Sequence, residues 1–189
     1  MNHPALVIGI VVAALILIAV AAYAYSRQRR TQTLRSRFGP EYDRVVSEEQ
    51  SVRRAEGVLE FREKKRKTLP IRELSRADQV AFEQRWHGVQ SRFVDDPSAA
   101  VLDADRLVIE LMTARGYPMS DFQTQAADIS VDHPHVIGHY REAHDIAELC
   151  RGGKADTEDL RRAMVHYRAL FEDLLGANVV DRQHEEVTR

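Results

Sequence analysis

The histidines between Asp132 and His144 are the residues whose type and spacing best suit chemistry. His135 and His139 lie four positions apart, so on a helix their side chains would be only about 40° apart and could share one metal ion. His144 follows His139 by five positions, about 140° around the axis, and no HExxH motif accompanies them. We therefore favour histidines at the edge of a helical core over a metal site, for which His135 and His139 are weak candidates.

A second group of polar side chains combines Tyr140 and His144 with His166 and Tyr167. The short connection at residues 151–156 predicts that the two helices carrying them are antiparallel, so the four side chains could meet. A buried cluster of this kind is typical of a structural hydrogen-bond network, and a proton-transfer site is the alternative. We assign no catalytic residue from this pattern.

Other charged or reactive residues indicate less specific chemistry. An acidic patch is better explained by helix capping than by Mg²⁺ binding, because no loop of regularly spaced oxygen ligands accompanies it. Cys150 is the single cysteine, so no disulfide can form within the chain. The sequence has no glycine-rich phosphate loop, GxSxG or CxxC motif, and it identifies no cofactor or small-molecule substrate. The acidic patch consists of Asp95, Asp96, Asp103 and Asp105.

The elements that must position these residues are helices, and we predict an all-α fold with a helical bundle over residues 75–176. Phe82, Trp86, Val89 and Phe93 recur at the spacing of one helix face. They are expected in the core, or in a partner groove if part of that face is uncovered. Expected N-caps are Ser75, Asp96, Ser120, Asp132 and Thr157, and expected helix stops are Gly116, Gly152, Gly153 and Gly176.

Residues 41–67 are predicted to form one long charged helix that begins after a break at Gly39–Pro40. Its apolar residues Val45, Val52 and Leu59 repeat every seven positions in a narrow stripe. This helix is either a solvated stalk or arm along the bundle, or a self-pairing coiled coil. The expected irregular segments are a linker at residues 68–74 and a disordered tail at residues 177–189.

Residues 5–25 contain no charged side chain. A helix of twenty-one residues spans about 31 Å, close to the thickness of the hydrocarbon core of a bilayer. A basic juxtamembrane collar follows at residues 26–40, whereas residues 1–4 carry no Lys or Arg. The positive-inside rule therefore predicts a single-pass anchor in the cell membrane, with residues 1–4 outside and the C-terminal domain in the cytoplasm. The collar arginines are Arg27, Arg29, Arg30, Arg35 and Arg37.

A cleaved signal peptide, and hence a secreted protein, is the alternative. Residues 22–24 read Ala-Tyr-Ala, which resembles a processing site. However, a signal peptide has a basic start and an apolar core of about 7–15 residues, and this segment has neither. We favour the uncleaved anchor, and we interpret the collar first as a topology signal and second as a site for lipid headgroups.

Charge is distributed unevenly along the chain. The formal net charge of −2 combines +5 for residues 1–40, +2 for residues 41–94 and −9 for residues 95–189. Nucleic acid and anionic lipid would repel the acidic half. The basic cluster at residues 62–67 lacks interleaved aromatic residues, so we expect no nucleic-acid partner.

Five short phrases occur in order along the chain: FGPEYDR, RFVDDP, RGYP, VDHP and MVHYR. Together they resemble a family of bacterial, actinobacterial-type hypothetical proteins described as single-pass membrane or secreted proteins. No activity or functional residue is established for that family, so the resemblance implies only a bacterial envelope setting.

These observations lead to one expected function and two alternatives. We expect a membrane-anchored helical module that faces the cytoplasm and binds a protein partner or a second copy of itself, without enzyme activity. The first alternative is an enzyme or metal-dependent sensor that uses the His/Tyr cluster. The second is a lipid-binding or nucleic-acid-binding protein that uses the basic arm.

Overall fold

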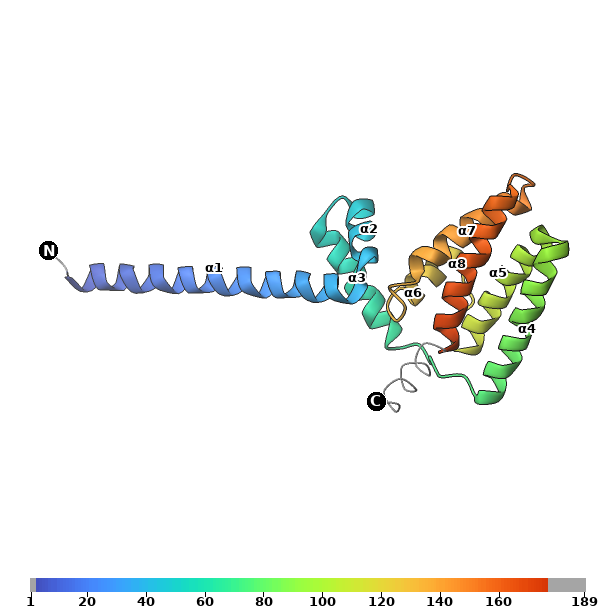
Figure 1. Cartoon of the computed structure of the whole chain (residues 1–189). Helices are drawn as coiled ribbons and strands as arrows, with labels where there is room; N and C mark the ends of the chain where they lie inside the picture. The colour runs from blue at the N-terminus through green and yellow to red at the C-terminus, as the bar shows by residue number, and fades with distance from the viewer. Residues whose placement is uncertain (1–2, 177–189) are drawn as a thin grey trace, which may run out of the picture.

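Eight helices and no strand make up residues 3–176, which are the residues that the computed structural model describes (Figure 1). The predicted all-α fold is therefore confirmed. Residues 1–2 and the predicted tail at 177–189 lie outside the described residues. The helices are α1 (His3–Phe38), α2 (Pro40–Glu49), α3 (Val52–Arg66), α4 (Arg76–Asp95), α5 (Pro97–Ala114), α6 (Phe122–Ile129), α7 (Ile137–Arg151) and α8 (Thr157–Leu175).

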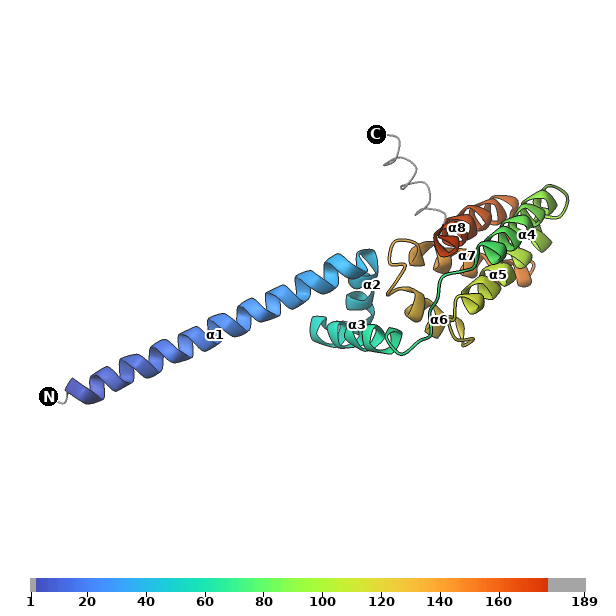
Figure 2. The same ribbon diagram turned by 90° about the horizontal axis from the view of Figure 1, so that it is seen from below.

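Helix α1 extends away from the remainder of the molecule (Figures 1 and 2). It is long and apolar enough to cross a membrane, a property that a signal sequence shares. From Val11 onward its apolar part is uncovered by the described chain, since Leu17 is 70% exposed and Ile18 is 64% exposed. The same helix continues without a break through the basic collar to Phe38.

The end of α1 packs with α2 and α3 into a small unit, which we call the neck (residues 31–66). Gly39, at φ 50°, ends α1, and Pro40 opens α2, as predicted from the sequence. The ion pairs Arg30–Glu60 and Arg37–Glu63 join α3 to α1, and α3 runs obliquely across the end of α1 (Figure 1). The small apolar core of the neck consists of Leu34, Phe38, Tyr42, Val45, Ala55, Leu59 and Val131.

The predicted long helix at residues 41–67 is interrupted. Gln50 adopts a left-handed conformation, at φ 52° and ψ 20°, and the chain reverses between α2 and α3. This conformation costs about 1–2 kcal/mol for a non-glycine residue. The reversal offsets that cost because it buries Val45 and Leu59 in the neck core. A coiled coil through the whole segment therefore has no continuous seam, and the C-terminal part of α3 instead lies against α6.

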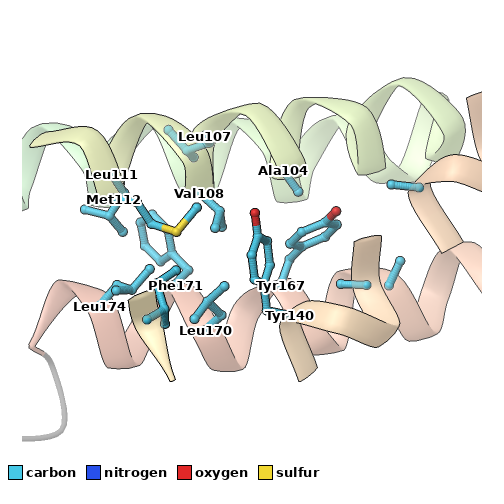
Figure 3. Close-up of a cluster of buried hydrophobic side chains, with 14 of the residues drawn as sticks. Ala104, Leu107, Val108, Leu111, Met112, Tyr140, Tyr167, Leu170, Phe171 and Leu174 are labelled. Atoms are coloured by element: carbon cyan, nitrogen blue, oxygen red, sulfur yellow. The ribbon is translucent and has the colours of Figure 1, made fainter. Parts of the chain in front are cut away.

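Helices α4–α8 form the bundle. α5 packs against α4 on one side and against α7 and α8 on the other (Figure 1). The core of the bundle contains twenty-three buried apolar residues, more than three times the seven in the core of the neck. Figure 3 shows part of this core, where Val108 and Leu111 of α5 face Leu170 and Phe171 of α8. Trp86 of α4 closes the other side by stacking on Phe171, with ring centroids 4.8 Å apart.

The predicted linker at residues 68–74 is irregular but docked. The backbone N–H of Arg72 donates to the carbonyl of Arg115 at 2.9 Å, and its guanidinium donates to that of Ala114 at 3.1 Å. Gly116, directly after the C-cap of α5, has φ 94°, and a Cβ atom there would lie 2.4 Å from the carbonyl oxygen of Pro70 in the linker. Only glycine therefore allows the linker to approach α5 so closely.

Two of the five predicted N-caps are confirmed. Ser75 and Asp96 cap α4 and α5 as predicted, and Gly176 ends α8. The predictions of Ser120 and Thr157 as caps were wrong, because Asp121 caps α6 and Asp156 caps α8. The prediction for Asp132 was wrong too: α7 begins only at Ile137, and the Asp132 carboxylate binds other partners.

Candidate functional site

Asp105 is the centre of the polar network inside the bundle. Its carboxylate is buried on α5; the hydroxyl of Tyr167 donates to Oδ1 at 2.7 Å, and the guanidinium of Arg151 donates to Oδ2. Nδ1 of His144 lies 3.9 Å from Oδ1. Tyr140 lies beside Tyr167, with both hydroxyls turned toward α5 (Figure 3), and it donates to Oε1 of Gln125 at 3.3 Å.

The antiparallel hairpin of α7 and α8 brings these groups together. The chain turns at Gly152 and Gly153, the latter at φ 64°, and Asp156 and Asp159 form a capping box at the start of α8. Tyr140 and His144 are four residues apart on α7, so both face the same side. The imidazole of His144 stacks on Phe122 of α6, with centroids 3.7 Å apart and planes 9° apart.

The protonation states favour a structural role for this network. Burial alone would raise the pKa of Asp105, but the polar groups of His144, Tyr167 and Arg151 outweigh it and lower the pKa. Burial, followed by the charge of Asp105, raises the pKa of both Tyr140 and Tyr167. At neutral pH the carboxylate is therefore an acceptor and the phenols are donors, so none of the three groups exchanges a proton readily.

His166 does not join this network. Its Nδ1 lies 2.8 Å from Nδ1 of His139, and its Nε2 lies 2.9 Å from a carboxylate oxygen of Glu142. Burial lowers the pKa of His166, and the neighbouring His139 lowers it further, while Glu142 opposes the shift. Of the four residues that were predicted to meet, the structure brings Tyr140, His144 and Tyr167 together and places His166 elsewhere.

The predicted pairing of His135 with His139 on one helix does not form. His135 precedes the first residue of α7, because the helix starts at Ile137 rather than near Asp132. His139 faces His166 instead. Within residues 3–176, no three His, Cys, Asp or Glu side chains are grouped so that they could hold a metal ion.

Glu41 is at the centre of one polar contact between the neck and the bundle. Its carboxylate is 2% exposed and accepts from Arg44 of α2, Arg62 of α3 and Arg141 of α7, at 2.7 to 2.9 Å. Burial alone would raise the pKa of Glu41, but the hydrogen bonds from Arg44 and Arg62 and the charge of Arg141 lower it. One buried carboxylate therefore connects three helices.

The basic cluster at residues 62–67 is largely engaged inside the molecule. Lys65 binds the buried carboxylate of Asp128 at 2.7 Å, and Arg66 binds Asp132. Asp132 also accepts from the hydroxyl of Tyr117 at 2.9 Å. These groups dock α3 onto α6 and the segment after it, which accounts for their charge without nucleic acid.

The five collar arginines have different partners. Arg30 pairs with Glu60 at 2.6 Å, Arg35 with Asp43 at 2.8 Å and Arg37 with Glu63 at 3.1 Å. Arg29 lies over the ring of Tyr25, 4.8 Å from its centroid. Arg27 makes no ion pair with any residue that the structure describes. The distal half of the collar therefore builds the neck, and the half next to the apolar segment is left exposed.

The bundle surface has a hollow of about 330 Å³ between α4 and α8, which we call the Trp86 hollow. Trp86 and Phe171 contribute buried rings, and Glu83, Arg168 and Glu172 contribute charge. The sequence predicted Trp86 in the core or in a partner groove; the structure places its ring in the core and also in the wall of this hollow. The hollow is lined by Glu83, Trp86, His87, Gln90, Arg168, Phe171, Glu172 and Leu175.

Comparisons of the chain with protein-family models, with curated proteins and with solved structures gave no match. The functional argument therefore depends on the geometry. Of the groups described above, two residues were missed from the sequence: Asp105 was attributed to helix capping, and Glu41 was not singled out.

Proposed function

We propose that this protein is a membrane-anchored helical module whose bundle faces the cytoplasm and binds a protein partner through the Trp86 hollow. The observation that carries the proposal is the continuity of α1. Its apolar part is uncovered, with Leu15 60% and Ile18 64% exposed, yet its other end supplies the buried Leu34 and Phe38 to the neck. A helix of this kind needs a non-aqueous environment at one end and a folded domain at the other.

The charge distribution supports the proposed orientation. The first forty residues carry +5, all of it after the apolar segment, and positive charge is retained on the cytoplasmic side. No flexible linker separates α1 from the neck. The neck and bundle would then be held at a defined height and rotation relative to the bilayer, which suits a protein that presents a surface to a partner.

The Trp86 hollow suits an amphipathic partner segment. Buried aromatic rings framed by polar side chains are typical of the centre of a protein interface. The rim holds two carboxylates, Glu83 and Glu172, against one guanidinium, Arg168. Residues 95–189, which supply half of the lining of the hollow, also carry −9. We therefore expect a partner with an apolar anchor residue flanked by basic side chains.

The geometry gives less support to an enzyme or a metal-dependent sensor. That function would need His166 to face the network of Tyr140, His144 and Tyr167, whereas His166 pairs with His139 and Glu142. The carboxylate at the centre of the network already has donors on both oxygens.

Site-specific photocrosslinking in bacterial membranes tests the proposal. A benzophenone amino acid replaces His87, an exposed residue on the rim of the hollow, and in a matched control replaces Asp145, an exposed residue on α7. We expect one discrete adduct from position 87, abolished by Trp86→Ala, and none from position 145. Equal labelling at both positions, or no adduct from a chain that runs as a monomer, would contradict the proposed binding function.

A further inference from the structure

A second hollow, of about 310 Å³, lies where the apolar part of α1 ends. It is formed by α1 and the first turn of α3, and we call it the α1–α3 hollow. Three of its side chains are guanidinium groups and one is a carboxylate. Its lining residues are Tyr23, Ser26, Arg27, Arg30, Arg53 and Glu56.

The reversal at Gln50 creates this hollow. Helix α2 has ten residues and runs mostly across the axis of α1 (Figure 1), and the chain then reverses into α3. This reversal brings the start of α3 back beside α1, where Arg53 and Glu56 line the same hollow as Arg27. Arg53 therefore lies beside Arg27 although the two are distant in sequence. An uninterrupted helix at residues 41–67 would have carried Arg53 away from the collar.

The charges in the hollow are not balanced within the chain. Glu56 is buried, and its carboxylate accepts from the hydroxyls of Thr31 at 2.5 Å and Tyr42 at 3.4 Å. Nε of Arg30 lies 2.6 Å from a carboxylate oxygen of Glu60 and 3.8 Å from one of Glu56, so this side chain is held in place. Arg27 and Arg53 make no ion pair with any residue in the described part of the chain. Two guanidinium groups are thus left to bind an anion from outside.

The depth of the hollow matches the headgroup layer of a bilayer. Along the axis of α1, Arg27 lies about 3 Å and Arg30 about 7.5 Å beyond Tyr25, the last residue of the apolar segment. The polar layer on each side of the hydrocarbon core is about 5–7 Å thick. The guanidinium groups therefore lie at the level of lipid phosphates if α1 spans the membrane.

We propose that the α1–α3 hollow binds the phosphate group of one anionic phospholipid, held between Arg27 and Arg53 and oriented by Arg30. Arginine suits this task because its planar guanidinium can donate two parallel hydrogen bonds to phosphate oxygens. This inference rests on the proposed membrane anchoring. It adds that the lipid occupies the gap between α1 and α3, so that binding fixes the neck relative to the bilayer.

Native mass spectrometry of the full chain released from lipid nanodiscs tests this proposal. The nanodiscs contain equal amounts of phosphatidylglycerol and phosphatidylcholine, and the readout is the number of each lipid retained per chain. We expect one phosphatidylglycerol in preference to phosphatidylcholine. Each of Arg27→Gln and Arg53→Gln should lower the apparent affinity for that lipid about fivefold.

Arg54→Gln is the matched control. It removes the same charge from the same turn of α3, but Arg54 donates to the carbonyl of Glu49 at 2.7 Å and does not line the hollow. Its effect should be less than twofold. An equal loss in Arg53→Gln and Arg54→Gln would overturn the proposal, because it would show general attraction to an anionic surface.

Two further measurements distinguish a failure of the lipid assignment from a failure of the proposed membrane anchoring. Inorganic phosphate at millimolar concentration should not displace the retained lipid, whereas displacement would show a site for free phosphate and overturn the lipid assignment. Retention of the same protein in membranes after alkaline carbonate extraction is measured in parallel. A chain that is extracted contradicts the proposed anchoring, whereas a chain that is retained without lipid preference contradicts only the α1–α3 site.

Discussion

The neck and the bundle use opposite means to hold helices together. The neck contributes six residues to an apolar core of seven, which Val131 completes, and ion pairs such as Arg37–Glu63 and Lys65–Asp128 also join its helices to one another and to the bundle. The bundle has twenty-three buried apolar residues and two buried carboxylates, Asp105 in its interior and Asp128 where α6 meets the neck. Apolar packing tolerates changes of pH and salt, whereas ion pairs do not. The part nearest the proposed membrane surface is therefore the part that responds to its ionic environment.

The largest expected effect comes from removing the polar centre of the bundle. Asp105→Ala leaves the hydroxyl of Tyr167 and the guanidinium of Arg151 without their acceptor, and we expect the free energy of unfolding to fall by about 3 kcal/mol. Urea unfolding of the full chain in detergent measures this change. Trp86 is the only tryptophan, so its fluorescence reports on the bundle.

Asp103→Ala is the control for this measurement. Asp103 lies on the same helix, but it pairs with Arg92 and Arg106 at the surface, so its loss should cost less than about 1 kcal/mol. Equal losses for the two variants would show that the buried network contributes no more than a surface pair.

A smaller effect, confined to the neck, is expected from Glu41→Gln. The change leaves Arg44, Arg62 and Arg141 without a shared carboxylate, and we expect docking of the neck onto the bundle to weaken by about 2 kcal/mol. Hydrogen exchange should become faster in α2 and α3 while the Trp86 unfolding transition stays unchanged. Glu48→Gln, which removes an exposed partner of Arg44, should change neither. A lower Trp86 transition in Glu41→Gln would mean that the two parts unfold as one unit.

The sequence predicted the features that depend on local chemistry. Proline and glycine set the break at Gly39–Pro40 and the end of α8 at Gly176, and free side-chain caps set the starts of α4 and α5. The sequence did not predict the reversal at Gln50, because no glycine or proline marks it. That turn forms because it buries Val45 and Leu59 against α1, and such a gain depends on contacts between distant segments.

Only part of the candidate site could be predicted, because the rest depends on contacts between distant segments. Tyr140 and Tyr167 lie on apolar stripes, and the structure buries both. Asp105 was missed although a signal was present: it lies four residues after Val101 and three before Val108, in the middle of a buried stripe. An acidic residue at such a position requires buried donors. The first residue of α7 could not be predicted, because the predicted N-cap Asp132 binds Arg66 and Tyr117 from other segments.

The smallest expected effect is a difference in acid sensitivity. The pKa of Glu41 is lowered from 4.5 and that of Asp105 from 3.8 in the folded chain. Each carboxylate therefore stabilises the fold above its ordinary pKa, and this contribution is lost as the pH falls through the lowered value. As the pH falls from 6 to 3, the neck should begin to lose protection against hydrogen exchange below about 4.5, before the bundle does. Glu41→Gln should remove that early loss, and an identical profile in both proteins would contradict the role of Glu41.

The orientation of α1 is the central claim, and cysteine accessibility tests it most directly. Cys150 is replaced by serine, and Val94, 83% exposed at the end of α4, is replaced by cysteine. We predict that a membrane-impermeant maleimide labels Val94→Cys only after spheroplasts are lysed, and that the labelled protein has the mass of the unprocessed chain. Labelling in intact spheroplasts, or a mass that lacks the residues up to Ala24, would contradict the cytoplasmic anchor.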